Sequence, residues 1–407
     1  MPIADAIAML EEKLAPVTGP ERVTLRHALN RILGEDIRSE RNVPPHDNSA
    51  VDGYAVYFDD LDEQSITRLT VTGRVAAGHP LGRMAKRGEA IRIFTGAPMP
   101  DGDDGGPDTV FMEEDATADG DEVILPPGLK HGANRRRIGE DVKAGEIIIG
   151  RGRRLRAQEI GLAASIGHAD VLVYQRLRAA VFSTGDEVRD PTDAAPEGCI
   201  FDANRYAVMS LLDGLGCEVT DLGIFTDDEG GIATVLEESA PDHDLLISSG
   251  GVSAGEEDHV KGAIERLGQM HFWRLAIKPG RPIALGQIGD TAFVGLPGNP
   301  VAAMVTFMFV ARPVVLRLAG ANDTSLPRFQ VKAGFDYKKK TGRREWARVK
   351  LVPGGNGLPV AIKYKSGGAG ILTSMVEADG LIEIGEDVAK LNKGEPVNYL
   401  PFSEVTQ

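Results

Sequence analysis

The spacing of apolar residues predicts a helix at the start of the chain. Ile3, Ile7, Leu10 and Leu14 recur three or four residues apart, which places them on one face of an amphipathic helix. Pro16, Gly19 and Pro20 end this pattern. A second helical segment is predicted over residues 24–33, and Gly34 is expected to end it.

The pattern becomes β-like in two other parts of the chain. Between residues 39 and 144, short apolar runs alternate with Gly, Pro and Asp clusters, which predicts a small β-rich lobe. Residues 154–173 return to mixed helix and strand. From 328 to 407, short alternating segments lie between glycine turns, which is typical of a small antiparallel barrel or sandwich.

The strongest strand–helix alternation lies at 177–319 and predicts a parallel sheet covered on both faces. A helix is expected over 203–215, with Asn204 as its cap and Gly216 as its stop. The segment 226–229 (TDDE) has capping-box spacing for a helix to about residue 240. Asn299 followed by Pro300 is the favoured order for starting the long apolar helix behind them.

Three glycine-containing loops follow apolar, strand-like runs in this region. They are STGDE at 183–187, SSGGVSAGEED at 248–258 and GLPGNP at 295–300. If the runs are parallel strands of one sheet, the three loops leave from the same edge, where open α/β sheets bind ligands. Glycine lets backbone N–H groups approach an anion, and carboxylates suit a hard cation beside phosphate. The pattern therefore predicts an enzyme for a phosphorylated, metal-bridged small molecule.

Composition narrows the class of protein. A chain of 407 residues is too long for one ordinary core, so two to four domains are expected. The net charge of −15 argues against nucleic acid or an anionic membrane surface as the main partner. Two cysteines favour a reducing cytoplasm. The apolar stretch 301–310 is interrupted by Arg312 and Pro313, short of the roughly 20 residues that span a bilayer. The acidic start of the chain does not have the pattern of a signal peptide.

Eight segments in order along the chain together resemble one known family. They are DNSAVDGYA at 47–55, FTGAP at 94–98, RRRIGED at 135–141, FSTGDE at 182–187, DAN at 202–204, SSGGVSAGEED at 248–258, IKPGRP at 277–282 and GLPGNP at 295–300. The chain is similar to the MoeA-type molybdopterin molybdenumtransferases, which include the E domain of gephyrin.

This resemblance implies an α/β multidomain fold with four domains. They are a MoaB/MogA-like three-layer α/β domain (1–19 and 175–325), an elongated linker domain (20–38 and 145–174), an inserted β-rich lobe (39–144) and a C-terminal β-barrel (326–407). It also implies a cytoplasmic homodimer with an active site near the junction of two subunits. The implied reaction inserts molybdate into adenylylated molybdopterin and releases AMP, assisted by a divalent cation such as Mg²⁺. A molybdopterin adenylyltransferase would supply the substrate.

The resemblance also implies roles for individual residues. Glu187 and Asp258 would hold the cation, and Asp52 and Asp141 match acidic catalytic positions of the lobe. Ser249, Gly250, Gly251 and Ser253 would cradle phosphate, and Lys278 and Arg281 would bind the molybdate oxyanion. The remaining implied ligand contacts are Thr95, Arg136, Arg137, Asn299 and Arg348.

Each of these residue types also has an ordinary structural interpretation. Glu187 and Asp258 are also typical of solvated loop acids, and paired glycines are also typical of a tight turn. Asn299 can cap its helix, and Thr95 can stabilise a turn. Arginine at position 281, where many members have lysine, keeps the charge but has a planar fork, so its role stays open. The segment 367–370 (GGAG) lacks a serine that members often show nearby, which leaves its contact with molybdate open.

Two other functions remain open at this stage. One is a scaffold or binding module, as gephyrin is at synapses. The other is a nucleotide hydrolase that uses the same α/β domain, which AMP release with and without molybdate would separate from a metal-inserting enzyme. The identity of the oxyanion (molybdate or tungstate) and of the cation also stay open.

Overall fold

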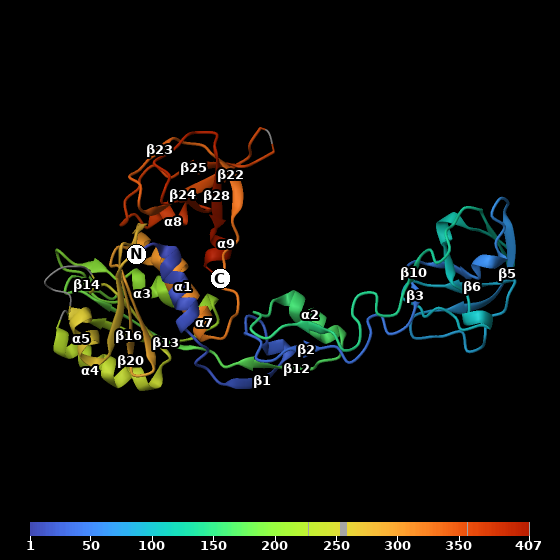
Figure 1. The fold of residues 1–407 in the computed structure, drawn as a ribbon, viewed down its shortest axis with the longest axis horizontal. Coiled ribbons are helices and arrows are strands. Elements are labelled where there is room, and N and C mark those ends of the chain that lie inside the picture. The colour runs from blue at the N-terminus through green and yellow to red at the C-terminus, as the bar shows by residue number, and fades with distance from the viewer. Residues whose placement is uncertain (227, 253–258, 356, 407) are drawn as a thin grey trace. The chain divides into compact units, whose positions relative to one another are not determined.

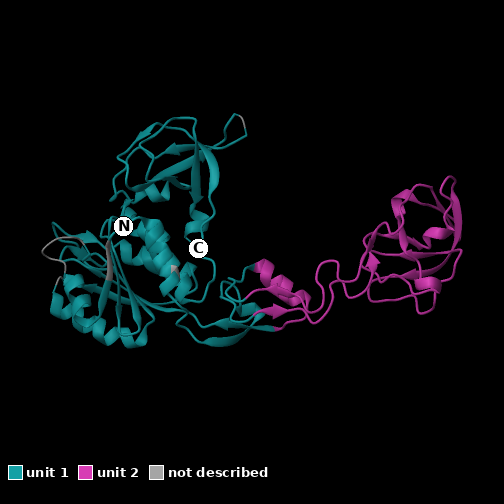
Figure 2. Ribbon diagram, viewed as in Figure 1, with its two compact units in different colours: residues 1–35, 151–156, 170–407 teal, residues 36–150, 157–169 magenta. Residues whose placement is uncertain are grey.

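The computed structural model describes residues 1–226, 228–252, 259–355 and 357–406. The chain divides into two compact units, which are coloured separately in Figure 2. Unit 1 comprises residues 1–35, 151–156 and 170–407, and unit 2 comprises residues 36–150 and 157–169. The chain therefore leaves unit 1 and returns to it, as expected for an inserted lobe. The four domain boundaries drawn from the sequence stay predictions.

The α/β part of unit 1 is built on a six-stranded sheet of order β16-β13-β17-β21-β20-β18. Its strands are β13 (Arg178–Thr184), β16 (Glu218–Phe225), β17 (Leu245–Ser249), β18 (Gln269–Arg274), β20 (Pro282–Ile288) and β21 (Thr291–Leu296). The prediction of a parallel sheet is confirmed for β16, β13, β17 and β21. It is wrong for β20, which runs antiparallel to both of its neighbours, β18 and β21, and a tight turn, not a crossover helix, joins β20 to β21.

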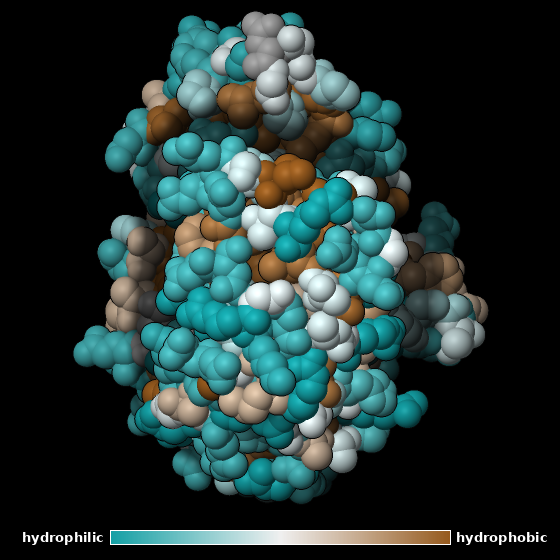
Figure 3. All heavy atoms as spheres, turned by 90° about the vertical axis from the view of Figure 1, so that its right-hand side faces the viewer, coloured by the Kyte–Doolittle hydropathy of each residue, from teal (hydrophilic) through white to brown (hydrophobic). Residues whose placement is uncertain are grey.

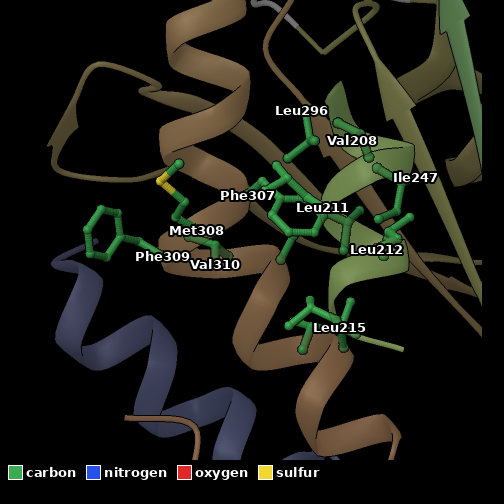
Figure 4. Packing of buried hydrophobic residues seen from close by; sticks show 14 of the residues in the cluster. Val208, Leu211, Leu212, Leu215, Ile247, Leu296, Phe307, Met308, Phe309 and Val310 are labelled. Carbon is green, nitrogen blue, oxygen red and sulfur yellow. The ribbon is translucent and has the colours of Figure 1, made fainter. Parts of the chain in front are cut away.

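Helices cover both faces of this sheet, as predicted (Figure 1). They are α1 (Ile3–Lys13), α3 (Asn204–Gly214), α4 (Glu229–Ser239), α5 (His259–Leu267), α6 (Pro300–Thr306) and α7 (Arg312–Leu318). Side chains alternate along β13, because Ala179 and Val181 belong to the core with α3 and α6, whereas Ala180 and Phe182 belong to the core with α4 and α5. Figure 4 shows part of the first core, where α3 packs against the long apolar helix.

The long apolar helix continues through Arg312 and Pro313, the two residues that interrupt the apolar stretch in the sequence. A π-helical stretch, η6 (Phe307–Ala311), joins α6 to α7 and carries the helix past the proline. The run 300–318 is long and apolar enough to cross a membrane by composition, but 89% of it is buried inside the protein. The buried guanidinium of Arg312 donates to the carbonyl oxygen of Thr324 at 3.1 Å. The run is a core helix.

The predicted helix over 24–33 is absent from the structure of those residues. They form β1 (Pro20–Thr24), the 3-10 turn η1 (Leu25–His27) and extended chain. Ile32 and Leu33 form isolated β-bridges with Arg154 and Val173 instead. β1 pairs with β12 (Asp170–Tyr174) over five residues, so distant pairing determines the structure of this segment.

The C-terminal part of unit 1 is a closed barrel of five strands, β24-β25-β22-β28-β26, in which β26 pairs again with β24. This confirms the barrel and excludes the sandwich, but the prediction that the barrel is antiparallel is wrong for β22 and β25, which pair in parallel. The elements are β22 (Phe329–Ala333), β23 (Tyr337–Lys338), β24 (Arg344–Val352), β25 (Val360–Lys363), α8 (Thr373–Val376), β26 (Gly380–Ile384), β27 (Lys390–Leu391), β28 (Pro396–Pro401) and α9 (Phe402–Val405). β19 (Ile277–Lys278) of the α/β part pairs with β24.

Unit 2 contains the predicted β-rich lobe, a six-stranded sheet of order β7-β4-β6-β5-β9-β8. Its elements are β4 (Gly53–Val56), β5 (Thr67–Val75), β6 (Glu89–Ile93), β7 (Thr109–Met112), β8 (Thr117–Asp119) and β9 (Glu122–Leu125). Two small ladders join the incoming and outgoing chains, and a helix follows them. They are β3 (Asn48–Ser49) with β10 (Arg135–Arg136), β2 (Ile37–Arg38) with β11 (Ile147–Ile149), and α2 (Ala157–Ser165).

The face of the protein in Figure 3 is mostly hydrophilic, with hydrophobic residues in separate patches. This agrees with a chain that carries 60 acidic and 45 basic residues.

The core of the α/β sheet leads to a first testable prediction. Phe182 is completely buried between β13 and the helices α4 and α5. Replacing it with alanine should lower the free energy of unfolding of this domain by about 3–5 kcal/mol, because the large cavity cannot collapse fully. The matched control is Phe201→Ala, since Phe201 is 52% exposed in the same domain and should change stability by less than about 0.5 kcal/mol. Denaturant unfolding curves of both variants measure the difference, and equal losses would contradict the packing described.

Candidate functional site

The three glycine-containing loops meet at one edge of the α/β sheet, as predicted. β17 lies between β13 and β21 and is parallel to both, with Ser183 opposite Ser249 and Ser249 opposite Leu296. The carboxyl ends of the three strands therefore point the same way. All three loops line one open cavity of about 920 Å³. We call it the strand-end cavity.

The glycines of the middle loop bring its backbone close to neighbouring atoms. Gly250 and Gly251 have φ angles of +93° and +62°, which side-chain-bearing residues rarely adopt. A Cβ on Gly250 would lie 2.8 Å from the carbonyl oxygen of Thr184, and one on Gly251 would lie 2.4 Å from Cγ2 of Val260. Only glycine fits at both positions. Consecutive positive-φ residues leave backbone N–H groups available to an anion.

Buried hydroxyls at the same strand ends have no hydrogen-bond partner within the described part of the chain. They belong to Ser183, Thr184 and Ser248. Ser183 and Thr184 are 2% and 5% exposed, and both line the strand-end cavity. Because buried polar groups are nearly always paired, the hydroxyls of Ser183 and Thr184 are suited to the oxygen atoms of a ligand in this cavity.

Glu187 also lines the strand-end cavity, with an exposed side chain. Its position is set through the backbone, because its carbonyl oxygen accepts a 2.8 Å bond from the N–H of Ile200. Asp258 and Ser253, the other cation and phosphate candidates of the middle loop, lie outside the described residues. Over residues 1–226, 228–252, 259–355 and 357–406, no three His, Cys, Asp or Glu side chains gather as metal ligands.

Asn299 occupies the N-cap position of α6, but its side chain makes no capping hydrogen bond. The prediction that Asn299 caps its helix is therefore confirmed for its position at the N-cap but not for its side chain. Its exposed side chain lines the strand-end cavity and also a second cavity of about 290 Å³. We call the latter the barrel cavity, because residues of β24 and of the loop after β25 line it together with Lys278.

Lys278 is held by the barrel. Its Nζ donates to Oε2 of Glu345 at 3.2 Å, and the hydroxyl of Tyr337 donates to the same oxygen at 2.8 Å. Glu345 is buried, whereas the Lys278 side chain is 53% exposed and lines the barrel cavity. Burial, followed by the hydrogen bond to Glu345, raises the pKa of Tyr337 to about 12. Arg281 is exposed and is not one of the described residues that line either cavity.

Arg348 lines the barrel cavity and fastens the glycine-rich loop beside it. Its guanidinium donates to the hydroxyl of Ser374 and to the carbonyl oxygens of Ser366 and Gly368, at 3.0, 3.2 and 3.0 Å. Burial lowers the pKa of Arg348. The side chain therefore supports the loop 366–370, a role that sequence reasoning did not assign to it.

The lobe candidates all belong to unit 2. Asp52 and Thr95 lie together, since Oδ1 of Asp52 accepts from the backbone N–H and the hydroxyl of Thr95 at 2.7 and 2.6 Å. These hydrogen bonds, the one from the hydroxyl first, lower the pKa of Asp52. The side chains of Arg136, Arg137 and Asp141 are exposed.

Arg135, the first residue of the arginine run, pairs with Asp47 through a 2.6 Å hydrogen bond from Nε to Oδ2. The N–H of Ile138 donates to the other oxygen at 2.6 Å. Burial raises the pKa of Asp47, but these two hydrogen bonds outweigh it and bring the pKa below its usual value. Asp47 therefore stabilises the local turn.

Sequence reasoning missed Asn204, which bridges two loops of the strand-end cavity. It was predicted to cap its helix, but the N-cap residue is Ala203 and Asn204 is the first helical residue. Its Nδ2 donates to Oγ of Ser249 at 2.8 Å and to the carbonyl oxygen of Gly298 at 2.7 Å. The capping prediction was wrong because Asp202 performs that function, accepting from the N–H of Arg205 at 3.1 Å. The only sequence signal was its place in the DAN segment.

Comparisons with known proteins agree with this architecture. Residues 1–167 match the MoeA N-terminal region (domain I and II), 180–317 match a probable molybdopterin binding domain, and 330–402 match the MoeA C-terminal region (domain IV). A molybdopterin molybdenumtransferase of Haemophilus influenzae is 39% identical over 98% of this chain and 97% of its own length. The chain belongs to the MoeA family of molybdopterin molybdenumtransferases.

Other MoeA relatives extend the similarity. A molybdopterin molybdenumtransferase of Nostoc is 32% identical over 98% of this chain and 93% of its own length. The solved structure of a molybdopterin biosynthesis MoeA protein from Pyrococcus horikoshii superimposes with a TM-score of 0.82. It is 28% identical and covers 98% of this chain and 99% of that one. The resemblance drawn from the eight segments is therefore confirmed along the whole chain.

The Asp52–Thr95 contact leads to a prediction on pH. In Thr95→Ala, Asp52 loses the hydrogen bond from the hydroxyl, so its pKa should rise toward the ordinary value. Because the folded pKa of Asp52 is lowered, its contribution to stability is present at neutral pH and is lost as the pH falls through that lowered pKa. The Asp52 titration, followed by carboxyl NMR, should move upward in Thr95→Ala and stay unchanged in Thr95→Ser. An unchanged titration in Thr95→Ala would contradict the contact.

The barrel cavity leads to a second prediction on pH. In Glu345→Gln, the pKa of Tyr337 should fall below about 12, since the negative charge beside the phenol is removed while burial remains. Tyrosinate absorbance measured against pH, with Tyr337→Phe to identify the signal, tests this. Glu386→Gln is the matched control, because Glu386 binds Arg344 in the same barrel. An unchanged pKa of Tyr337 in Glu345→Gln would contradict the hydrogen bond between Tyr337 and Glu345.

Proposed function

We propose that this protein is a molybdopterin molybdenumtransferase that inserts molybdate into adenylylated molybdopterin and releases AMP. It would act in the cytoplasm as a homodimer, with a divalent cation, on substrate from a molybdopterin adenylyltransferase. The observation that carries the proposal is the strand-end cavity, where positive-φ glycines, unpaired hydroxyls and Glu187 surround one space. The whole-length similarity to enzymes named for this activity supports it.

The phosphate of the adenylyl group would bind in the strand-end cavity. The N–H groups of Gly250 and Gly251 and the hydroxyls of Ser249 and Thr184 would donate to its oxygens. Ser253 is proposed for the same role on the basis of the family resemblance. Donors that are already fixed in the free protein do not have to reorganise as charge develops on the leaving phosphate.

Glu187 and Asp258 would hold the cation beside the phosphate. Mg²⁺ is usually bound through one or two carboxylates together with substrate phosphates, so the exposed carboxylate of Glu187 fits such a site in combination with a phosphate ligand. When bound, the cation would withdraw charge from the phosphoanhydride. Glu187 would orient it from the rim of the cavity.

The oxyanion would bind in the barrel cavity. Lys278 supplies a charge there that Glu345 holds in place, and Asn299 supplies an amide between the two cavities. A dianion needs converging donors, and a cation with fixed geometry provides one. Arg348 would act mainly through the loop 366–370, and Arg281 would add positive charge outside the cavity. On the basis of the family resemblance, we also propose roles in catalysis or substrate binding for residues of the lobe, namely Thr95, Asp52, Asp141, Arg136 and Arg137.

Glu187→Gln should lower molybdate-dependent AMP release by about 100-fold or more, because even indirect changes at a metal site cost 10–100-fold. Asp258→Asn should have the same effect. Glu197→Gln removes an exposed carboxylate ten residues further along the chain, outside the residues that line the strand-end cavity, and should leave turnover unchanged. AMP release from purified protein and adenylylated molybdopterin, with circular dichroism to verify folding, is the measurement.

Two outcomes would contradict this function. Full turnover in both Glu187→Gln and Asp258→Asn would exclude their proposed role with the cation. AMP release that is equally fast with and without molybdate would point instead to a nucleotide hydrolase.

A further inference from the structure

The hydrogen bond between Asn204 and Ser249 has a defined direction. Nδ2 of Asn204 lies 2.7 Å from the carbonyl oxygen of Gly298, and a carbonyl can only accept. The amide oxygen would be repelled at this position, so the nitrogen must occupy it. The same nitrogen lies 2.8 Å from Oγ of Ser249. The amide therefore donates to both loops, and the Ser249 hydroxyl is the acceptor.

An accepting hydroxyl still has its own proton to donate. Ser249 is 3% exposed and lines the strand-end cavity. Within the described part of the chain, the Ser249 hydroxyl donates no hydrogen bond to another protein group. With the Asn204 side occupied by a donor, the O–H bond of Ser249 must point away from the amide.

Asn204 is held firmly enough to enforce this direction. The next residue, Arg205, is 3% exposed and forms ion pairs with Asp190, Asp202 and Asp221. Burial opposes the charge of Arg205, but the hydrogen bonds to Asp221 and Asp202 outweigh it and raise its pKa. The start of α3 is thus fixed to β16 through Asp221 and to Asp190, which follows β14 (Val188–Arg189).

We propose that Asn204 is a positioning residue that turns the Ser249 hydroxyl proton toward the ligand in the strand-end cavity. Ser249 then acts only as a donor, so the cavity favours an oxygen that only accepts, such as a phosphate oxygen. This inference rests on the proposed function, because it assumes that Ser249 binds the phosphate of the adenylyl group.

Aspartate at position 204 would reverse the arrangement. A carboxylate has the same shape as the amide but can only accept hydrogen bonds. The Ser249 hydroxyl would therefore donate its hydrogen bond to this carboxylate and not to the ligand. The carboxylate would also face the Gly298 carbonyl and place a negative charge beside the phosphate. Phosphate binding should therefore suffer more from Asn204→Asp than from Asn204→Ala.

The test is a double-mutant cycle on AMP binding, measured by calorimetry on the full chain. Ser249→Ala and Asn204→Ala should each weaken AMP binding by about 10-fold, the usual effect of losing a hydrogen bond to a charged group. If Asn204 acts through Ser249, the double variant should bind AMP as weakly as Ser249→Ala alone. Such non-additivity is the signature of two groups acting as one.

Adenosine serves as the ligand without phosphate. Its binding should be the same in wild type, Asn204→Ala and Asn204→Asp, whereas a merely structural role of Asn204 would weaken adenosine and AMP alike. Asn204→Asp keeps the side-chain shape and tests the proposal even if Asn204→Ala does not fold. Ser210→Asp is the matched charge control, because Ser210 is an exposed residue of α3 outside the cavity.

The outcomes separate this inference from the function on which it rests. Unchanged AMP affinity in Ser249→Ala would overturn both the phosphate cradle and the role of Asn204. Weakened AMP binding in Ser249→Ala, combined with no effect or an additive effect of Asn204→Ala, would overturn the role of Asn204 alone. Equal losses of AMP and adenosine binding in Asn204→Asp would also overturn that role.

Discussion

The parallel pairing of β17 with both β13 and β21 is the constraint on which the rest of the structure depends. Parallel neighbours end at the same edge of a sheet, so three loops that are far apart in sequence must meet there. The two helical layers make this pairing stable by burying both faces of the sheet. The strand-end cavity follows from the topology, and the glycines, hydroxyls and Glu187 give it its chemistry.

The second consequence is a link between the α/β part and the barrel. β19 leaves the sheet region and pairs with β24, which brings Lys278 to the buried carboxylate of Glu345. Asn299 lines both cavities, so one side chain stands between the proposed phosphate site and the proposed oxyanion site. The proposed reaction needs the phosphate and the oxyanion close together, and two cavities that share Asn299 in their linings would hold them so.

Local patterns in the sequence were sufficient to predict much of the α/β fold and the edge at which the loops meet. The alternation from 177 to 319 predicted the strands, the helices and the shared edge, because period and turn residues report directly on buried faces. Glu187 and Ser249 were placed at this edge because each lies in a loop after a strand-like run, whereas Lys278 was named from the family resemblance, and the roles of all three stay predictions. The helix predicted over 24–33 failed because Ile32 and Leu33 face distant partners, Arg154 and Val173, which spacing within one segment cannot reveal.

The fine structure of the site depended on contacts across long sequence separations. Asn204 lies 45 residues from Ser249 and 94 from Gly298, so its bridging role could not be read from helix-cap preferences. Glu345 lies 67 residues from Lys278, and its burial in the barrel is what makes it a partner. Arg348 was predicted as a ligand contact from its motif, whereas its hydrogen bonds to the loop 366–370 emerge only from the folded barrel.

The most direct measurement of the central claim is a crystal structure of the protein with AMP and a divalent cation. The account predicts the phosphate at the ends of β13 and β17, within hydrogen-bond distance of the Gly250 and Gly251 N–H groups and the Ser249 hydroxyl, with the cation beside Glu187. A nucleotide bound elsewhere on the protein, with the strand-end cavity left to solvent, would contradict it.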